Sequence, residues 1–253
     1  MYNNDYQKYA KKKITVFLVQ QNKKALKTIG LIGGLTWHST LDYYRLLNEL
    51  TNKELGGDHA AKIILNSVDF AEIKELTEKQ DWDGIAVIIC DAAKTIEKAG
   101  AHCLMIGANT MHNIADKVQA SVSIPVIHIA DAVAAVINIK GLKKVALLGT
   151  KYTMQMDFYK TRLAAKNITV IIPDETNIEI INKSIYTEFS KGIFLPERKQ
   201  QYLQIINSLI ERGAEGIILG CTEIPILIKQ ADCTVPVFDT TLIHTDAAVK
   251  FAN

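Results

Sequence analysis

No hydrophobic segment of the sequence is long enough to cross a membrane, because no apolar run approaches the roughly 20 residues that a transmembrane helix needs. A secretory signal is missing as well. The apolar stretch at residues 14–19 is shorter than the roughly 7–15 residues that such a signal requires, and no small-residue cleavage site follows it. We therefore expect a cytoplasmic protein without a membrane partner.

Cysteine is scarce, and its spacing excludes the common structural uses of this residue. The four cysteines of the 253-residue chain form no Cys-x-x-Cys pair, and none lies near a histidine at zinc-finger spacing. A chain of this length needs no disulfides to fold, so reduced thiols are expected. The histidines and aspartates show no ligand spacing that specifies a metal. A P-loop and a G-x-G-x-x-G dinucleotide motif are also missing, and we expect neither a metal nor a cofactor.

Excess positive charge is confined to the N-terminal segment. Residues 1–26 carry six Lys against one Asp, and subtracting this +5 from the formal net charge of +2 leaves −3 for the rest of the chain. Nucleic-acid binding needs clustered Lys and Arg on the folded surface, so we expect no nucleic-acid partner. Residues 1–26 are interpreted as a disordered extension, with a basic surface anchor as the alternative.

From residue 27 onward, short apolar segments rich in β-branched residues alternate with amphipathic segments of helical periodicity. The predicted strands cover residues 29–33, 62–68, 103–107, 125–129, 145–149, 169–172, 216–220 and 235–239. The clearest helical patterns cover residues 85–99, 154–166, 178–191 and 198–212, with a last helix at 241–252. Continuous apolar strands alternating with helices indicate parallel sheets covered on both faces, so the predicted fold class is α/β.

The order of motifs in the first half of the chain returns in the second half. Residues 27–33, 107–110 and 124–126 match residues 143–149, 220–223 and 235–237, at offsets of 116, 113 and 111. This repetition predicts two similar duplicated lobes, residues 27–140 and 141–253, each a mostly parallel sheet flanked by helices. The last helix is expected to cross back to the first lobe. Because ligands bind beyond the carboxyl ends of parallel strands, an active-site cleft is predicted between the lobes.

Cys221 directly follows an apolar strand and precedes a predicted helix start. The backbone N–H groups and the positive dipole end of that helix favour a thiolate. Glu223 acts in the opposite direction, because a nearby carboxylate raises the pKa of a thiol. A buried and inert cysteine is the alternative. The match with residues 107–110 favours a functional role, since both turns would line the same cleft.

Three segments resemble the signature segments of the aspartate/glutamate racemase family: IGGLTW at residues 32–37, ANTMH at 108–112 and GCTE at 220–223. SVDF at residues 67–70 and ALLGTKYTM at 146–154 are similar to a broad-specificity amino-acid racemase branch of that family. The resemblance runs from about residue 27 to the C-terminus. It implies an isomerase that acts on a small amino acid without pyridoxal phosphate, by proton transfer at the α-carbon.

The resemblance further implies two bases on opposite sides of the α-carbon. In many relatives both are cysteines, and Cys221 matches the second of them. Ala108 holds the place of the first, and its methyl group can neither accept nor donate a proton. Cys103 lies too far along the same strand to replace it. Thr110, His112 or a water near Ala108 remain as substitutes, and we expect Cys221 to deprotonate the L-substrate efficiently while the opposite face reacts slowly.

Polar residues at the strand-to-helix turns are candidates for substrate binding. The resemblance implies that these turns hold the substrate carboxylate, and the candidates are Asn109, Thr110, Thr222, Glu223, Thr36 and Thr153. Helix capping is the alternative for most of them, because the same residue types favour caps. Some relatives with acidic substrates hold the side-chain carboxylate with a Lys on the helix of residues 178–191. Ile180 takes that place here, with Lys183 one turn on, which favours a side chain other than Asp or Glu.

Two other functions remain open. A single-cysteine decarboxylase or isomerase of the same superfold would have Cys at the second site and a small residue at the first. A ligand-binding protein that kept the cleft but lost turnover would also account for Ala108 and Ile180. The ANTMH segment fits the racemase branch better. The resemblance leaves a homodimer open as well.

Overall fold

The computed structural model describes residues 25–253, so residues 1–24 of the expected extension lie outside the described part. In the first half, strands β1 (Ile29–Gly33), β2 (Ile63–Ser67) and β3 (Cys103–Ile106) alternate with helices α2 (Trp37–Leu55), α3 (Phe70–Glu78) and α4 (Trp82–Lys98). The 3-10 helix η1 (Thr110–Ile114) and the helices α5 (Ala115–Ser121) and α6 (Ile129–Ile139) follow.

The second half repeats this alternation. Its strands are β4 (Lys144–Gly149), β5 (Thr169–Ile171), β6 (Ile217–Gly220) and β7 (Val237–Asp239). Its helices are α7 (Lys151–Gln155), α8 (Asp157–Ala164), α9 (Glu175–Thr187), α10 (Pro196–Glu211), α11 (Ile224–Leu227) and α12 (Thr240–Ala252), with 3-10 turns η2 (Phe189–Lys191) and η3 (Gln230–Asp232). Many of the helices begin after a side chain that caps their first N–H groups, as the residue types predict: Thr36, Asp69, Asp81, Thr150, Asp174 and Asp239.

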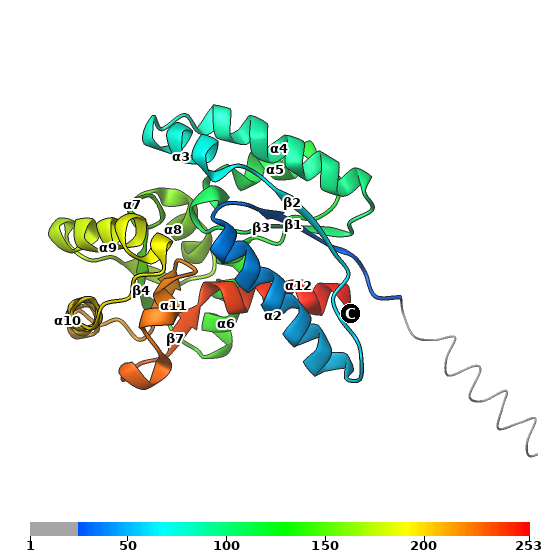
Figure 1. Ribbon diagram of the computed structural model, residues 1–253. Helices are drawn as coiled ribbons and strands as arrows, with labels where there is room; N and C mark the ends of the chain where they lie inside the picture. Colours follow the sequence, from blue (N-terminus) through cyan, green and yellow to red (C-terminus); the bar gives the residue numbers. More distant parts are fainter. Residues whose placement is uncertain (1–24) are drawn as a thin grey trace, which may run out of the picture.

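The two halves form separate parallel sheets with corresponding strand orders. The first sheet has the order β2-β1-β3 and the second the order β5-β4-β6-β7, so the first strand of each half is flanked by the second and the third. All the pairings are parallel. Figure 1 shows helices on both sides of these sheets. The predicted α/β class, with parallel sheets flanked by helices, is confirmed.

The prediction of a strand at residues 125–129 is wrong. A single parallel bridge joins Val126 to Leu104, and His128 already caps α6. Pro125 has no N–H group, and the helix begins too soon for a ladder to continue. The Gln119 side chain takes the place of a neighbouring strand, because its Oε1 accepts from the Val126 N–H at 2.8 Å.

The same side-chain substitution returns in the second half. Gln230, which lies 111 residues after Gln119, accepts from the Val237 N–H at 2.9 Å and donates to the Val235 carbonyl at 3.1 Å. This offset equals that between the two Pro-containing segments of the sequence. The repeat therefore extends beyond strand order to individual hydrogen bonds, which supports duplication.

The helix predicted over residues 154–166 is two helices. Met156 separates α7 from α8 with an extended backbone, at φ −71° and ψ 156°. The Lys160 ammonium donates to the Gln155 carbonyl at 2.8 Å and so satisfies one acceptor at the end of α7. The helix α7 is therefore only five residues long and ends just before α8 begins.

The last helix of each half packs in the core of the other half. From α6, Val133 and Ile137 belong to the cluster around β4 and β6. From α12, Ala248 and Val249 belong to the cluster around β1 and β3, and α12 lies beside α2 in Figure 1. The lobe boundary near residue 140 stays a prediction, since α6 precedes it in sequence but packs with the second sheet.

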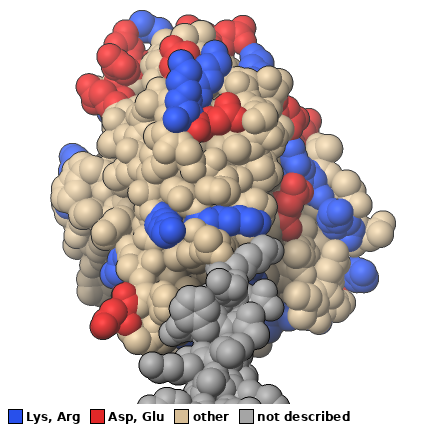
Figure 2. Space-filling view, turned by 90° about the vertical axis from the view of Figure 1, so that its right-hand side faces the viewer, with Lys and Arg blue, Asp and Glu red and all other residues tan. Residues whose placement is uncertain are grey.

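Within residues 25–253, no helix is both long and apolar enough to span a membrane. On the face shown in Figure 2, acidic and basic side chains are intermixed, and residues of other kinds cover much of the centre.

Candidate active site

A cavity of about 370 Å³ opens at the carboxyl ends of strands from both sheets. Its floor is formed by the turns after β1, β3, β4 and β6, where the sheet geometry predicts a ligand site. These turns contribute Leu35, Thr36, Ala108, Asn109, Thr110, Met111, Thr150, Gly220, Cys221, Thr222 and Glu223. Helix α2 adds Ser39, and α3, α7 and α9 supply the remaining walls. Both halves of the chain therefore build one site.

The turn between β1 and α2 depends on Gly34. Its φ is +76°, and an added Cβ would lie 2.0 Å from the Val68 carbonyl oxygen, so only glycine fits. This turn delivers Thr36, whose hydroxyl oxygen caps α2 by accepting from the Ser39 N–H at 3.2 Å. The Thr36 hydroxyl also lies 3.5 Å from Oε1 of Glu223. Thr36 thus links the first half of the chain to the second across the cavity floor.

Cys221 lies at the end of β6 and lines the cavity, with 9% of its surface exposed. Its thiol donates to Oε2 of Glu223 at 2.9 Å, and the Thr222 hydroxyl donates to the same oxygen at 2.6 Å. Glu223 is itself buried, and the bond from Thr36 reaches its other oxygen. The carboxylate is therefore held beside the thiol by side chains from both halves.

This environment favours a neutral thiol. Burial is the main reason that the pKa of Cys221 is raised well above its ordinary value, and the negative charge of Glu223 and its hydrogen bond raise it further. The backbone N–H groups of Glu223 and Ile224 act in the opposite direction, because they stabilise a thiolate. Cys221 thus rests as a thiol that is hydrogen-bonded to a carboxylate able to accept its proton.

The turn after β3 brings Ala108 and Asn109 to the same cavity from the first sheet. The Asn109 amide nitrogen donates to the Thr240 hydroxyl oxygen at 3.0 Å, which in turn donates to the Leu219 carbonyl at 2.9 Å. The Asn109 Oδ1 is buried and has no partner within residues 25–253. A buried acceptor without a donor is costly, so this atom is available to a ligand that brings an N–H or O–H group.

Three threonine hydroxyls connect the turn after β3 with the turn after β4. Thr110 lies 2.8 Å from Thr150 and 3.2 Å from Thr153, and the latter two are 3.1 Å apart. Thr110 and Thr150 line the cavity, whereas Thr153 is fully buried behind them. Thr153 therefore acts on the site through the other two, and the cluster contains no group that ionises at neutral pH.

His112 lies outside the cavity lining, although it follows the site turn directly. Its Nδ1 bonds the Ala108 carbonyl at 2.9 Å, which assigns the proton to Nδ1 because a carbonyl only accepts. The ring packs edge-on against His128 and His244, at centroid distances of 4.6 and 5.4 Å. Burial, and then the two neighbouring imidazoles, lower the pKa of His112 well below 6.5. His112 therefore lies outside the cavity, where its ring holds the Ala108 backbone, and a part in proton transfer stays a prediction.

The structure excludes Cys103 as a second thiol of the site. Its side chain is fully buried in the core that β1 and β3 form with the last helix. Burial raises its pKa to about 12. Within the described residues no group of three or more His, Cys, Asp or Glu is arranged to hold a metal ion.

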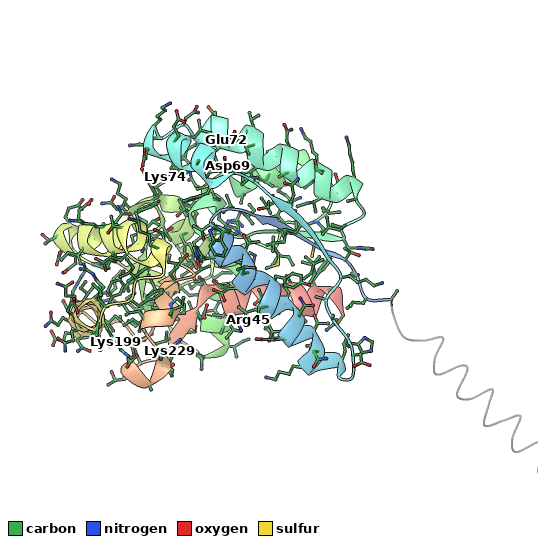
Figure 3. The ribbon with its side chains drawn as sticks, viewed as in Figure 1. Arg45, Asp69, Glu72, Lys74, Lys199 and Lys229 are labelled. Carbon is green, nitrogen blue, oxygen red and sulfur yellow. The ribbon has the colours of Figure 1, made fainter. Side chains whose placement is uncertain are left out.

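The helical walls of the cavity carry residues that the sequence did not single out. They are Phe70, Lys74, Thr77 and Glu78 of α3, Lys151 and Tyr152 of α7, and Asn182, Ile185, Tyr186, Thr187 and Ser190 near α9. Lys74 is visible on α3 in Figure 3. Ile180 and Lys183, which the sequence suggested for the side-chain subsite, are not in the lining. Phe70, Lys151 and Tyr152 had a signal in the sequence, because they lie in the segments SVDF and ALLGTKYTM that carry the family resemblance.

Comparison with known proteins gives a consistent result. The model of the family described as Asp/Glu/Hydantoin racemase matches residues 32–248. The broad specificity amino-acid racemase RacX of Bacillus subtilis is 26% identical over 173 residues, which cover 67% of this chain and 73% of that protein.

Solved structures agree with this match. A candidate Asp/Glu racemase from Yersinia pestis is 47% identical and superposes with a TM-score of 0.85, covering 89% of this chain and 99% of that one. An aspartate racemase homologue from Pyrococcus horikoshii is 39% identical, with a TM-score of 0.79 and the same coverage of 89% and 99%. A glutamate racemase from Francisella tularensis, 19% identical with a TM-score of 0.62 over 89% of this chain and 81% of that one, shares the fold.

Proposed function

The chain belongs to the Asp/Glu/hydantoin racemase family, and we propose that it is an amino-acid racemase that uses the Cys221 thiol without a cofactor. The observation that carries this proposal is the contact of 2.9 Å between Cys221 and Glu223 on the floor of a cavity shared by both sheets. A thiol beside a carboxylate can give up its proton locally, and a thiolate is a base suited to an α-carbon.

Glu223 is proposed to act as the acceptor of the thiol proton. A neutral thiol cannot remove a proton from carbon, and burial raises the pKa of Cys221 so far that few thiolates form by exchange with water. Transfer to Oε2 of Glu223 produces the thiolate inside the cavity, where the backbone N–H groups of Glu223 and Ile224 stabilise it. The bonds from Thr222 and Thr36 keep the carboxylate in reach of the sulfur.

The polar groups of the two turns are proposed to orient the substrate. The Oδ1 atom of Asn109 can accept from the substrate ammonium, because it is buried and unpartnered among the described residues. The hydroxyls of Thr110 and Thr222 lie on the same cavity floor and can bond the substrate carboxylate. Such contacts place the α-hydrogen toward Cys221 and the opposite face toward Ala108.

A water beside Ala108 is proposed as the proton donor on the opposite face. Cys221 takes the α-proton, the carbanion takes a proton from this water, and the hydroxide that remains takes the proton held by Glu223. The thiol, the carboxylate and the water are then restored, with the configuration of the α-carbon inverted. A water is a poorer acid than a thiol, so the two faces react at unequal rates.

The experiment that tests this proposal is α-proton exchange in D₂O, followed by NMR with both enantiomers of Asp, Glu and a panel of small amino acids. Exchange by the wild-type protein without added cofactor, and its loss in the Cys221→Ala variant, would support the racemase. Exchange that persists in the variant would contradict the assignment of the thiol. A pyridoxal phosphate addition serves as a control and is expected to have no effect.

Decarboxylation is a second candidate, favoured by one specific observation. Ala108 leaves the site with a single ionisable thiol, and a lone acid suffices to protonate an enolate formed by loss of CO₂. This function predicts no α-exchange with any amino acid, together with CO₂ release from an α-substituted malonate that depends on Cys221. NMR samples that contain an α-substituted malonate in place of the amino acids distinguish it from racemisation.

A further inference from the structure

The turn that follows β3 is held by hydrogen bonds from a single residue, His112. Its backbone N–H donates to the Asn109 carbonyl at 3.0 Å, and its ring Nδ1 lies 2.9 Å from the Ala108 carbonyl oxygen. Ala108 and Asn109 line the cavity, whereas His112 does not. Both carbonyls of this turn are therefore bonded to one residue that lies behind the cavity floor.

These bonds fix the direction of the peptide group between Ala108 and Asn109. Residues 25–253 contain no cis peptide bond, and in a trans peptide the C=O and N–H groups point in opposite directions. Because the Ala108 carbonyl points toward His112, the Asn109 N–H points away from it, and this N–H has no acceptor among the described residues. Rotation of the peptide would put a carbonyl oxygen where the N–H stands, and it would displace the Asn109 side chain.

The His112 ring is fixed by two other imidazoles. It is 2% exposed and packs edge-on against His128 and His244, at centroid distances of 4.6 and 5.4 Å. His128 caps α6 by accepting from the Ala130 N–H, and His244 of α12 donates to the Ile127 carbonyl. The ring therefore lies between the two helices that the halves exchange, and both neighbouring rings have bonds of their own.

Packing alone does not account for a histidine at this position. An apolar ring would fill the same space, whereas burial of an imidazole removes water from two polar nitrogens. Nε2 of His112 is buried and has no partner within residues 25–253. The one ring hydrogen bond that offsets the cost of burial is the bond to the Ala108 carbonyl, so the polar side of this residue serves the site turn.

We propose that His112 is a positioning residue, whose Nδ1–H holds the peptide between Ala108 and Asn109 in the orientation that the reaction requires. This inference rests on the proposed function, in which Ala108 faces the α-carbon opposite Cys221. In this role His112 exchanges no proton with the substrate. A floor that shifts by about 1 Å moves the α-carbon relative to the thiol, and a misplacement of that size costs about 100-fold in rate.

The hydrogen bond is tested without any substrate, by ¹⁵N NMR of the imidazoles. A ring that donates to a carbonyl from Nδ1 carries its proton on that nitrogen in the neutral state. At pH 7.5 the wild-type protein should show the Nδ1–H tautomer for His112, whose signals are assigned by their loss in His112→Asn. The Nε2–H tautomer would overturn the proposal.

The effect on the reaction is tested by the kinetics of α-exchange, with the amino acid that exchanges fastest. His112→Phe keeps an aromatic ring in the cluster but removes the donor, so kcat should fall about 100-fold while KM changes by less than about threefold. In His112→Asn the amide nitrogen takes the place of Nδ1 and should restore most of kcat. The amide of His112→Gln lies one bond further out and should not restore it.

His244→Phe is the matched control, because it removes an imidazole that is buried as fully and makes no bond to the turn. Both Phe variants should lose stability in urea unfolding, but only His112→Phe should lose kcat. An unchanged kcat in His112→Phe, or an equal loss in His244→Phe, would overturn the proposal. If His112→Phe does not fold, equal kcat values of His112→Asn and His112→Gln would overturn it. Wild-type protein without exchange would contradict the proposed function, and this role with it.

Discussion

We expect the buried histidine cluster to make the protein less stable in mild acid. His112, His128 and His244 come from η1, the start of α6 and α12, and each is at most 6% exposed. Burial is the first cause of a lowered pKa in all three: to about 3 for His128, to about 4 for His244, and well below 6.5 for His112. In the unfolded chain each imidazole titrates near 6.5.

The direction of the pH effect follows from these values. Between about pH 4 and pH 6.5 the unfolded chain binds protons that the folded protein does not, so the free energy of unfolding falls as the pH falls below 6.5. At pH 5.5, protonation of the unfolded chain at His128 and His244 lowers the free energy of unfolding by about 1.4 kcal/mol each relative to pH 7.5, or about 3 kcal/mol together. This is a large share of the roughly 5–15 kcal/mol that stabilises an ordinary protein. His112 acts in the same direction.

The assay is urea unfolding followed by circular dichroism at pH 7.5, 6.5 and 5.5. Two hydrogen bonds hold the His244 ring in one neutral tautomer. The Tyr43 hydroxyl donates to its Nδ1 at 3.0 Å, and its Nε2–H donates to the Ile127 carbonyl. His128→Asn retains a capping side chain for α6 and should reduce the loss by about 1.4 kcal/mol. The exposed His59 provides the control, since His59→Gln should not change it. A wild-type loss below about 1 kcal/mol would show that the buried imidazoles do not have such low pKa values.

Three further predictions concern single residues of the site. Glu223→Gln removes the negative charge that, after burial, raises the pKa of Cys221. Iodoacetamide should therefore alkylate that thiol faster at pH 8, and slower alkylation would contradict this effect of the charge. The α-exchange rate should fall about 100-fold, because the thiol loses its proton acceptor. Ala108→Cys supplies a thiol on the opposite face and should raise α-exchange from the slower enantiomer about 100-fold in the same NMR assay, whereas an unchanged rate would show that this face is not reached. Gly34→Ala forces a Cβ against the Val68 carbonyl at positive φ and should lower the free energy of unfolding by about 3 kcal/mol in urea titration, and a loss below 1 kcal/mol would mean that the turn relaxes easily.

The sequence predicted the cavity floor because strand ends can be located from apolar runs. Cys221, Asn109, Thr110 and Thr36 each lie within four residues of the end of such a run, and the ends of parallel strands gather at one edge of a sheet. The internal repeat added that both halves contribute to one site.

The helical walls could not be predicted in the same way. Which residues of α3 and α9 face the cavity depends on how these helices are rotated against the sheets, and their periodicity marks only the buried side. His112 illustrates the same limit. It lies in a 3-10 helix directly after a turn of the site, but its ring is not in the cavity lining.

The exchange of last helices between the halves was expected in one direction only. The sequence suggested that α12 returns to the first half, but α6 packs on the second sheet by the corresponding crossing. Both helices are apolar on their buried sides, and hydrophobic patterning does not say which sheet a helix will cover.

In the proposed mechanism one thiol, Cys221, performs the proton transfer on one face of the α-carbon, and no ionisable side chain stands opposite it at Ala108. Initial rates of α-deuterium incorporation from the L and the D enantiomer of the same amino acid test it most directly. We expect fast exchange from the L enantiomer, slow exchange from the D enantiomer, and loss of the fast rate in Cys221→Ala. Equal initial rates from the two enantiomers would contradict it, because they would require a second base of comparable strength on the Ala108 side.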